Sequence, residues 1–104
     1  MPATLSVART GQETTINIKG RFCYDMHTLF REAYLEETKD KRTNRRFVVD
    51  LAGTEYIDSS ALGMLLLLRE ETDTNDANVE IVNARPEVLK ILTTANFDRL
   101  FKIR

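Results

Sequence analysis

Three consecutive polar residues, Asp58, Ser59 and Ser60, have the types and spacing that could support chemistry. Aspartate and serine are preferred at the start of a helix, because their oxygens accept hydrogen bonds from backbone N–H groups that the helix leaves free. The positive end of the helix dipole also favours a negative group there, by about 0.3–1 kcal/mol. The triplet is therefore compatible with two roles: a purely structural cap, or a site at which a phosphate on Ser59 is tolerated.

The segment after the triplet predicts a helix that is apolar on nearly every side. Leu62, Leu65 and Leu66 fall on one side, and Met64, Leu67 and Leu68 cover most of the remainder. A helix on the surface of a sheet needs an apolar stripe of only about 100°, so we expect this one to expose apolar area that a partner covers. The expected contact residues are Ala61, Leu62, Gly63, Met64 and Leu67. A phosphate on Ser59 would add about −1.5 to −2 charges beside this surface, which predicts a docking surface controlled by phosphorylation.

Catalysis by Ser59 has little support in the sequence. The serine lacks the G-x-S-x-G elbow of serine hydrolases, and the only histidine, His27, is predicted on a different helix. The sequence also has no G-x-x-x-x-G-K-[ST] phosphate loop, and its single cysteine, Cys23, has no second thiol for a metal site. We therefore predict a non-enzyme without catalytic residues, metal or cofactor. A small hydrolase is the alternative if a base lies beside Ser59.

The first half of the chain predicts the elements that lead up to the triplet. Alternating apolar residues predict a hairpin with strands at 4–9 and 14–19, and a continuous apolar run predicts a buried strand at 47–51, directly before the triplet. Between them, Asp25 is expected to cap a helix whose apolar stripe is Met26, Leu29, Phe30 and Ala33.

The second half predicts the elements that complete the sheet. A helix begins near Ser60, a strand covers 79–82, and Pro86 suits the first position of a third helix. Asn96 is a suitable stop for that helix, and the last residues indicate a short edge strand. The apolar face of the third helix is Val88, Leu89, Ile91, Leu92 and Ala95. The order β-β-α-β-α-β-α-β indicates an α/β fold, with a mixed sheet and helices packed against it.

Length and charge limit the classes of function. The 104 residues suit one domain, 1–104, and a formal net charge of −1 gives no overall field for nucleic acid or an anionic membrane. The longest apolar run is far shorter than the ~20 residues of a membrane-spanning helix. With its lone cysteine and no leader pattern, the chain is expected to be cytoplasmic. The basic cluster 39–46 is expected to be a solvated loop, with docking of an acidic partner face as a secondary role. The acidic residues Glu70, Glu71, Asp73 and Asp76 are unfavourable for the dipole of the preceding helix, which indicates a role in surface recognition.

The run from Tyr56 to Gly63, preceded by Asp50-Leu51, resembles the signature of STAS domains, specifically the small bacterial anti-sigma factor antagonists. The resemblance extends over nearly the whole chain and implies a single STAS-like domain. It further implies that Ser59 is phosphorylated by a partner that is both serine kinase and anti-sigma factor, and is restored by a PP2C-type phosphatase. Asp58 would orient the serine, and Ser60 would mainly cap the helix. The sequence departs from many members at Arg21-Phe22-Cys23 and at Ala61.

The resemblance and the residues together predict a phosphorylation-controlled binding module. When unphosphorylated on Ser59, it would sequester its kinase partner and so release the client of that partner. The ATP would belong to the kinase. Two alternatives stay open: a constitutive scaffold or ligand-sensing STAS module, and a partner switch whose output is not a sigma factor.

Overall fold

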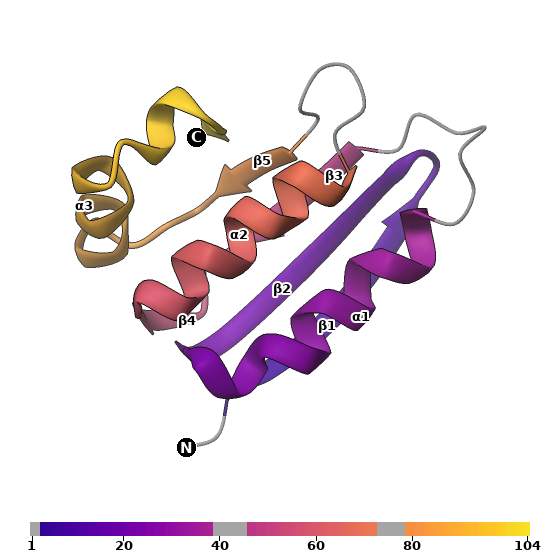
Figure 1. Ribbon diagram of the computed structural model, residues 1–104, viewed down its shortest axis with the longest axis horizontal. Helices are drawn as coiled ribbons and strands as arrows, with labels where there is room; N and C mark the ends of the chain where they lie inside the picture. Colours follow the sequence, from indigo (N-terminus) through magenta and orange to yellow (C-terminus); the bar gives the residue numbers. More distant parts are fainter. Residues whose placement is uncertain (1–2, 39–45, 73–78) are drawn as a thin grey trace.

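The computed structural model describes residues 3–38, 46–72 and 79–104, and shows an α/β domain with a mixed sheet and three helices (Figure 1). The strands are β1 (Thr4–Thr10), β2 (Glu13–Phe22), β3 (Arg46–Asp50), β4 (Thr54–Ile57), β5 (Val79–Val82) and β6 (Lys102–Ile103). The helices are α1 (His27–Thr38), α2 (Ser59–Thr72) and α3 (Pro86–Thr94), with short 3-10 turns η1 (Tyr24–Met26) and η2 (Phe97–Arg99). The fold class expected from the sequence is confirmed, and the element order gains one short strand, β4.

The opening hairpin is confirmed. Strands β1 and β2 pair antiparallel, with Thr10 opposite Glu13 at the turn. Gly11 lies in that turn with φ of 58°, a conformation that glycine adopts without steric cost. The pairing places Val7 beside Ile16 and Leu5 beside Ile18, so the alternating apolar residues share one face of the sheet.

All three helices cover the same face of the sheet. The strand order is β1-β2-β3-β5-β6, and β2, β3, β5 and β6 run parallel. The connections from β2 to β3, from β3 to β5 and from β5 to β6 each contain one helix and all move in the same direction across the sheet. Connections between parallel strands are nearly always right-handed, so these three place their helices on the same side of the sheet. Figure 1 shows α1 and α2 together in front of the strands, and all three helices contribute to one core cluster. The other side of the sheet is here called the helix-free face; one row of it is Thr15, Val48, Glu80 and Lys102.

Strand β4 is the element that the sequence did not predict. The long strand β2 pairs with β3 along 13–17 and, after a register shift at Gly20, with β4 at its far end. The turn between β3 and β4 is fixed by Asp50, whose Oδ1 accepts a hydrogen bond from the Ala52 N–H at 2.9 Å. The Gly20 N–H also donates to the Gly53 carbonyl at 2.9 Å. The polar triplet therefore follows β4 and not β3, and lies beyond the end of β2.

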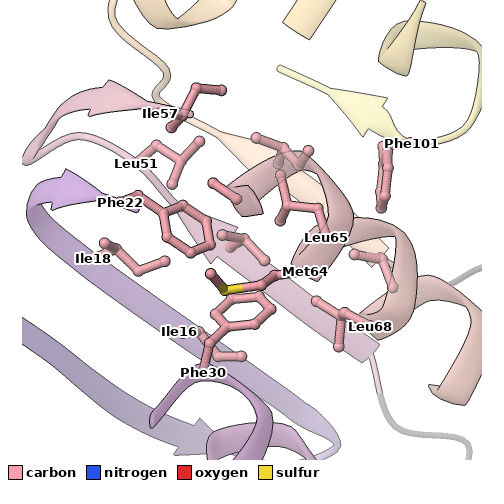
Figure 2. Packing of buried hydrophobic residues seen from close by; sticks show 14 of the residues in the cluster. Ile16, Ile18, Phe22, Phe30, Leu51, Ile57, Met64, Leu65, Leu68 and Phe101 are labelled. Carbon is pink, nitrogen blue, oxygen red and sulfur yellow. The ribbon is translucent and has the colours of Figure 1, made fainter. Parts of the chain in front are cut away.

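The core explains which helix residues are buried. In and just before α1, Met26, Phe30 and Tyr34 are buried at intervals of four, whereas Leu29 is 52% exposed, so its assignment to the apolar stripe is wrong. The rings of Phe22 and Phe30 lie 5.2 Å apart, and Figure 2 shows the Met64 side chain pointing toward them. The expected cap at Asp25 is also wrong, because Asp25 lies inside η1.

The two ends of α3 lie where the sequence predicted them. Pro86 is the first residue of α3, and Asn96 has φ of 62°, the left-handed conformation expected after the helix. Val88 and Leu92 are buried and Ile91 is half-buried, but Leu89 and Ala95 are exposed, so the buried face of α3 is narrower than expected. α3 packs against β4, the strand that leads into α2.

Candidate functional site

Asp58 joins β4 to α2 and is held on both sides. Its N–H donates to the Phe22 carbonyl at the end of β2, at 3.3 Å. Its Oδ1 accepts from the Ala61 N–H at 2.8 Å, and its own carbonyl accepts from the Leu62 N–H at 3.2 Å. This is the geometry of an N-cap residue, which stabilises a helix by about 0.5–2 kcal/mol. Asp58 is therefore the cap, and the expectation that Ser60 would mainly serve this role is corrected, because Ser60 already lies inside α2.

Ser59 and Ser60 are both exposed at the first turn of α2. A helix places residues four, seven and eleven positions apart on one side, so Ser59, Gly63 and Glu70 share the side of α2 that faces solvent. Glu70 is exposed, Gly63 is half-buried, and Leu67, next to this side, is 39% exposed. We call these four residues, Ser59, Gly63, Leu67 and Glu70, the α2 surface. The Ser59 hydroxyl thus lies where an enzyme can reach it.

The apolar surplus of α2 is mostly covered by the protein itself. Ala61 is 0% exposed and Met64 is 3% exposed, so neither side chain is available to a partner in this structure. The reason is that α1 packs along α2 and the core closes over Met64 (Figure 2). Of the five residues expected to contact a partner, Leu62 and Gly63 are half-buried and Leu67 is exposed. The surface left for a partner is therefore smaller than the sequence indicated.

Gly63 has no structural explanation within the described residues. A Cβ built on it meets nothing within 4 Å, and its φ is not in the left-handed region. Glycine inside a helix costs about 0.5–1 kcal/mol relative to alanine. The fold therefore accepts a small loss of stability at a position one turn after Ser59.

Three residues beside the triplet were not identified as contact residues from the sequence. Arg21 and Tyr56 face each other across β2 and β4, with the guanidinium carbon 4.9 Å from the ring centre. Tyr24, in the η1 turn that packs against α2, is 73% exposed. Exposed aromatic and arginine side chains are enriched at protein interfaces. Because the Arg21–Tyr56 pair depends on β4, the sequence pattern alone could not bring these residues together.

The remaining candidates form no described contact with the triplet or lie outside the described residues. His27 is exposed at the start of α1, and Cys23 is half-buried with a free thiol. Within 3–38, 46–72 and 79–104, no group of three or more His, Cys, Asp or Glu residues could hold a metal ion. Residues 39–45 of the basic cluster, and Asp73 and Asp76 of the acidic one, lie outside these ranges. Glu71 forms an ion pair with Arg31 of α1 at 3.7 Å.

Tyr34 marks the contact between α1 and α2. Burial, and secondarily the charge of Glu71, raise the pKa of the Tyr34 hydroxyl to about 12. The side chain is 1% exposed and its ring packs edge-on against Phe30. This contact fixes α2 against α1 at the end remote from Ser59.

None of the helices in the described part of the chain has the length and apolar character needed to cross a membrane.

Comparison with known proteins agrees with this architecture. A family model described as "Mlab, STAS domain" matches residues 5–103. A STAS-domain containing protein of Pseudomonas aeruginosa is 48% identical over 103 residues, which make up 99% of each chain. The chain therefore belongs to the STAS-domain family.

Two solved structures show what this fold resembles. An anti-sigma factor antagonist from Mycobacterium paratuberculosis superposes with a TM-score of 0.82 at 17% identity, over 98% of this chain and 85% of that one. The Bacillus cell fate determinant SpoIIAA, in its phosphorylated form, superposes with a TM-score of 0.74 at 13% identity, over 97% and 91% of the two chains. At these identities the likeness concerns the fold, which is that of anti-sigma factor antagonists.

Proposed function

We propose that this STAS domain is a phosphorylation-controlled protein-binding regulator. In its unphosphorylated form it sequesters a serine kinase that is also an anti-sigma factor, and so releases the client of that kinase. The observation that carries the proposal is the exposure of Ser59 on the α2 surface, directly after a fixed N-cap. A PP2C-type phosphatase would reverse the modification.

The cap geometry supports a switch that leaves the fold intact. Asp58 is held by the end of β2 and by the first turn of α2, so a group added to the Ser59 oxygen displaces no hydrogen bond of the cap. The helix dipole favours the added negative charge by about 0.3–1 kcal/mol, and the neighbouring Asp58 carboxylate offsets part of this gain. We therefore expect phosphorylation to change stability little.

The α2 surface supports an effect on binding. A phosphoryl group adds about −1.5 to −2 charges one turn from Gly63, where a partner can approach closely. Burying that charge against an apolar surface such as Leu67 without a matching cation is costly. The phosphorylated form would therefore lose a partner that docks on this surface. Tyr24 and the Arg21–Tyr56 pair supply the aromatic and cationic contacts at its edge.

The first experiment tests the modification. The protein is purified from cells of its own species, and its intact mass and phosphorylated residue are determined. We expect a species heavier by one phosphoryl group that disappears in the Ser59→Ala variant and persists in Ser60→Ala, a matched control with the same exposed serine chemistry. Phosphate found on Ser60 instead of Ser59, or no phosphorylated form in any growth condition, would contradict the proposal.

The second experiment tests the control of binding. Wild type, Ser59→Ala and Ser59→Asp are compared as baits for the kinase, with Ser60→Asp as a control that adds the same charge one residue away. We expect Ser59→Ala to bind, Ser59→Asp to bind at least tenfold more weakly, and Ser60→Asp to lose less. If all four bind alike, the α2 surface is not switched by charge.

Two other outcomes define the alternatives. A partner that binds equally in all variants, with no phosphorylated form in cells, favours a constitutive scaffold or ligand-sensing module. A kinase partner whose own client is not a sigma factor keeps the switch and changes its output. An activity-based serine probe that labels Ser59 would favour a small hydrolase.

A further inference from the structure

Glu80 is an almost fully buried carboxylate on the helix-free face. Its side chain is 6% exposed, and each of its oxygens contacts one arginine. Arg46 Nη2 donates to Oε1 at 2.5 Å, and Arg104 Nε donates to Oε2 at 2.8 Å. Lys102 Nζ lies 4.0 Å from Oε1. Strands β3, β5 and β6, with Arg104 directly after β6, thus bring three cations around one acid; we call these four residues the Glu80 cluster.

The cluster holds its cations in place and leaves them accessible. The side chains of Arg46, Lys102 and Arg104 are 51%, 70% and 62% exposed, although the acid between them is buried. Burial acts to raise the pKa of Glu80, but the hydrogen bonds from Arg104 and Arg46 outweigh it and hold the pKa below its usual value. Glu80 therefore stays charged near neutral pH and positions both guanidinium groups.

Positive charge remains in excess at the β6 end of the cluster. One carboxylate contacts three cations. Among the described residues, two further acids lie on this face in the strand register: Glu13, beside Arg46, and Asp50, opposite Val82. The Asp50 oxygens accept hydrogen bonds from the Ala52 N–H and the Asn83 side chain, and neither acid lies on a strand next to Lys102. An arginine already ordered by one carboxylate loses less side-chain entropy when it binds a second one. Its remaining N–H donors suit the planar, two-oxygen geometry of another carboxylate.

We propose that the Glu80 cluster is a docking site for an acidic segment of a partner protein, one that presents Asp or Glu side chains. Protein carboxylates fit better than nucleic acid, because the cluster spans only three strands and the chain as a whole has a net charge of −1. Helix α2 lies in front of the strands (Figure 1), whereas the Glu80 cluster lies on the helix-free face, so the α2 surface is on the other side of the sheet. The protein can therefore hold an acidic partner at the Glu80 cluster while Ser59 is free or occupied.

A synthetic hexaglutamate peptide with blocked ends tests this site. The peptide is titrated into the isotope-labelled protein at low ionic strength, and amide shifts are followed by NMR. We expect the largest shifts at Val48, Lys102 and Arg104 and none at Ser59. Binding should weaken on addition of salt, since exposed charges are screened. Lys102→Gln, at a site 70% exposed, should leave the fold intact and weaken binding by up to about fivefold.

Lys90→Gln is the matched control, because Lys90 is exposed on α3 and its removal changes the net charge equally. Equal weakening by Lys90→Gln and Lys102→Gln would overturn the proposal, as would shifts centred on α2 or no binding at low salt. Tighter binding of a single-stranded oligonucleotide of the same charge would indicate nucleic acid instead. Self-association that Lys102→Gln abolishes would identify a second copy of the chain as the occupant.

Discussion

Replacing Gly63 with alanine should stabilise the protein and weaken the binding of its proposed partner. The added methyl group meets nothing within 4 Å, so no repacking offsets the gain in helix propensity. That gain is about 0.5–1 kcal/mol, which corresponds to a rise in Tm of about 2–8 °C for a domain of this size. If a partner approaches the helix backbone at this position, the same methyl group stands in its way. Stability and binding should therefore change in opposite directions.

Thermal and urea unfolding measure the stability, and calorimetric titration with the kinase captured by the Ser59→Ala bait measures the binding. Gly11→Ala is the matched control, because a Cβ there also meets nothing within 4 Å but φ is +58°. It should destabilise by about 1 kcal/mol, since alanine is strained in that conformation. If both variants shift stability in the same direction, the reasoning from backbone conformation is refuted. If Gly63→Ala stabilises without weakening the complex, Gly63 is not a contact.

Three further predictions concern the cap and two titrating groups. Asp58→Ala should lose about 0.5–2 kcal/mol in urea unfolding, whereas Asp58→Asn should lose much less, because asparagine also caps; equal losses would contradict the cap. The pKa of Glu80 is lower in the folded protein than in the unfolded chain, so ionised Glu80 stabilises the fold at pH values above the ordinary glutamate pKa of about 4.3. This stabilisation is lost as the pH falls through the pKa that Glu80 has in the folded protein. Glu80→Gln should therefore lack that part of the acid dependence of unfolding. The pKa of Tyr34 is raised to about 12 in the folded protein, compared with about 10 in the unfolded chain. The stability that the neutral Tyr34 hydroxyl contributes is therefore fully present below pH of about 10, and it is lost as the pH rises from there to about 12. Tyr34→Phe should lack this alkaline decline, and an identical decline in both proteins would show that other groups cause it.

The elements that local patterns determine were predicted from the sequence. The hairpin at β1 and β2 follows from alternation, and the start of α3 follows from Pro86 at its first position. Asn96 ends the helix region in the left-handed conformation expected of it. Each of these signals acts within a few residues, so neighbouring sequence is sufficient to read it.

The elements that depend on distant contacts were not predicted. β4 has only four residues, and it exists as a strand because the far end of β2 pairs with it. The buried side of α1 includes Tyr34 and not Leu29, because α2 packs along that side. The same packing buries Ala61 and Met64, which the sequence had placed on the docking surface.

The candidate site divides in the same way. Asp58 and the exposed Ser59 were identified from residue type and position, and the structure shows that Asp58, rather than Ser60, forms the cap. Arg21, Tyr24 and Tyr56 were not identified as contact residues, because Arg21 and Tyr24 come to the triplet only through the pairing of β2 with β4 and the packing of η1 against α2. The phosphorylation of Ser59 stays a prediction that the experiments above address.

The anchoring of Asp58 to the end of β2 has a kinetic consequence. A loop tied to an inner strand is expected to keep one shape before and after an encounter, so that association resembles the collision of two preformed surfaces. Any rearrangement then falls to the proposed kinase partner. Among variants of one interface, affinity differences appear mainly in the rate of dissociation. Modification of Ser59 would thus shorten the lifetime of the complex more than it slows its formation, and a regulator of this kind can release its target without first unfolding.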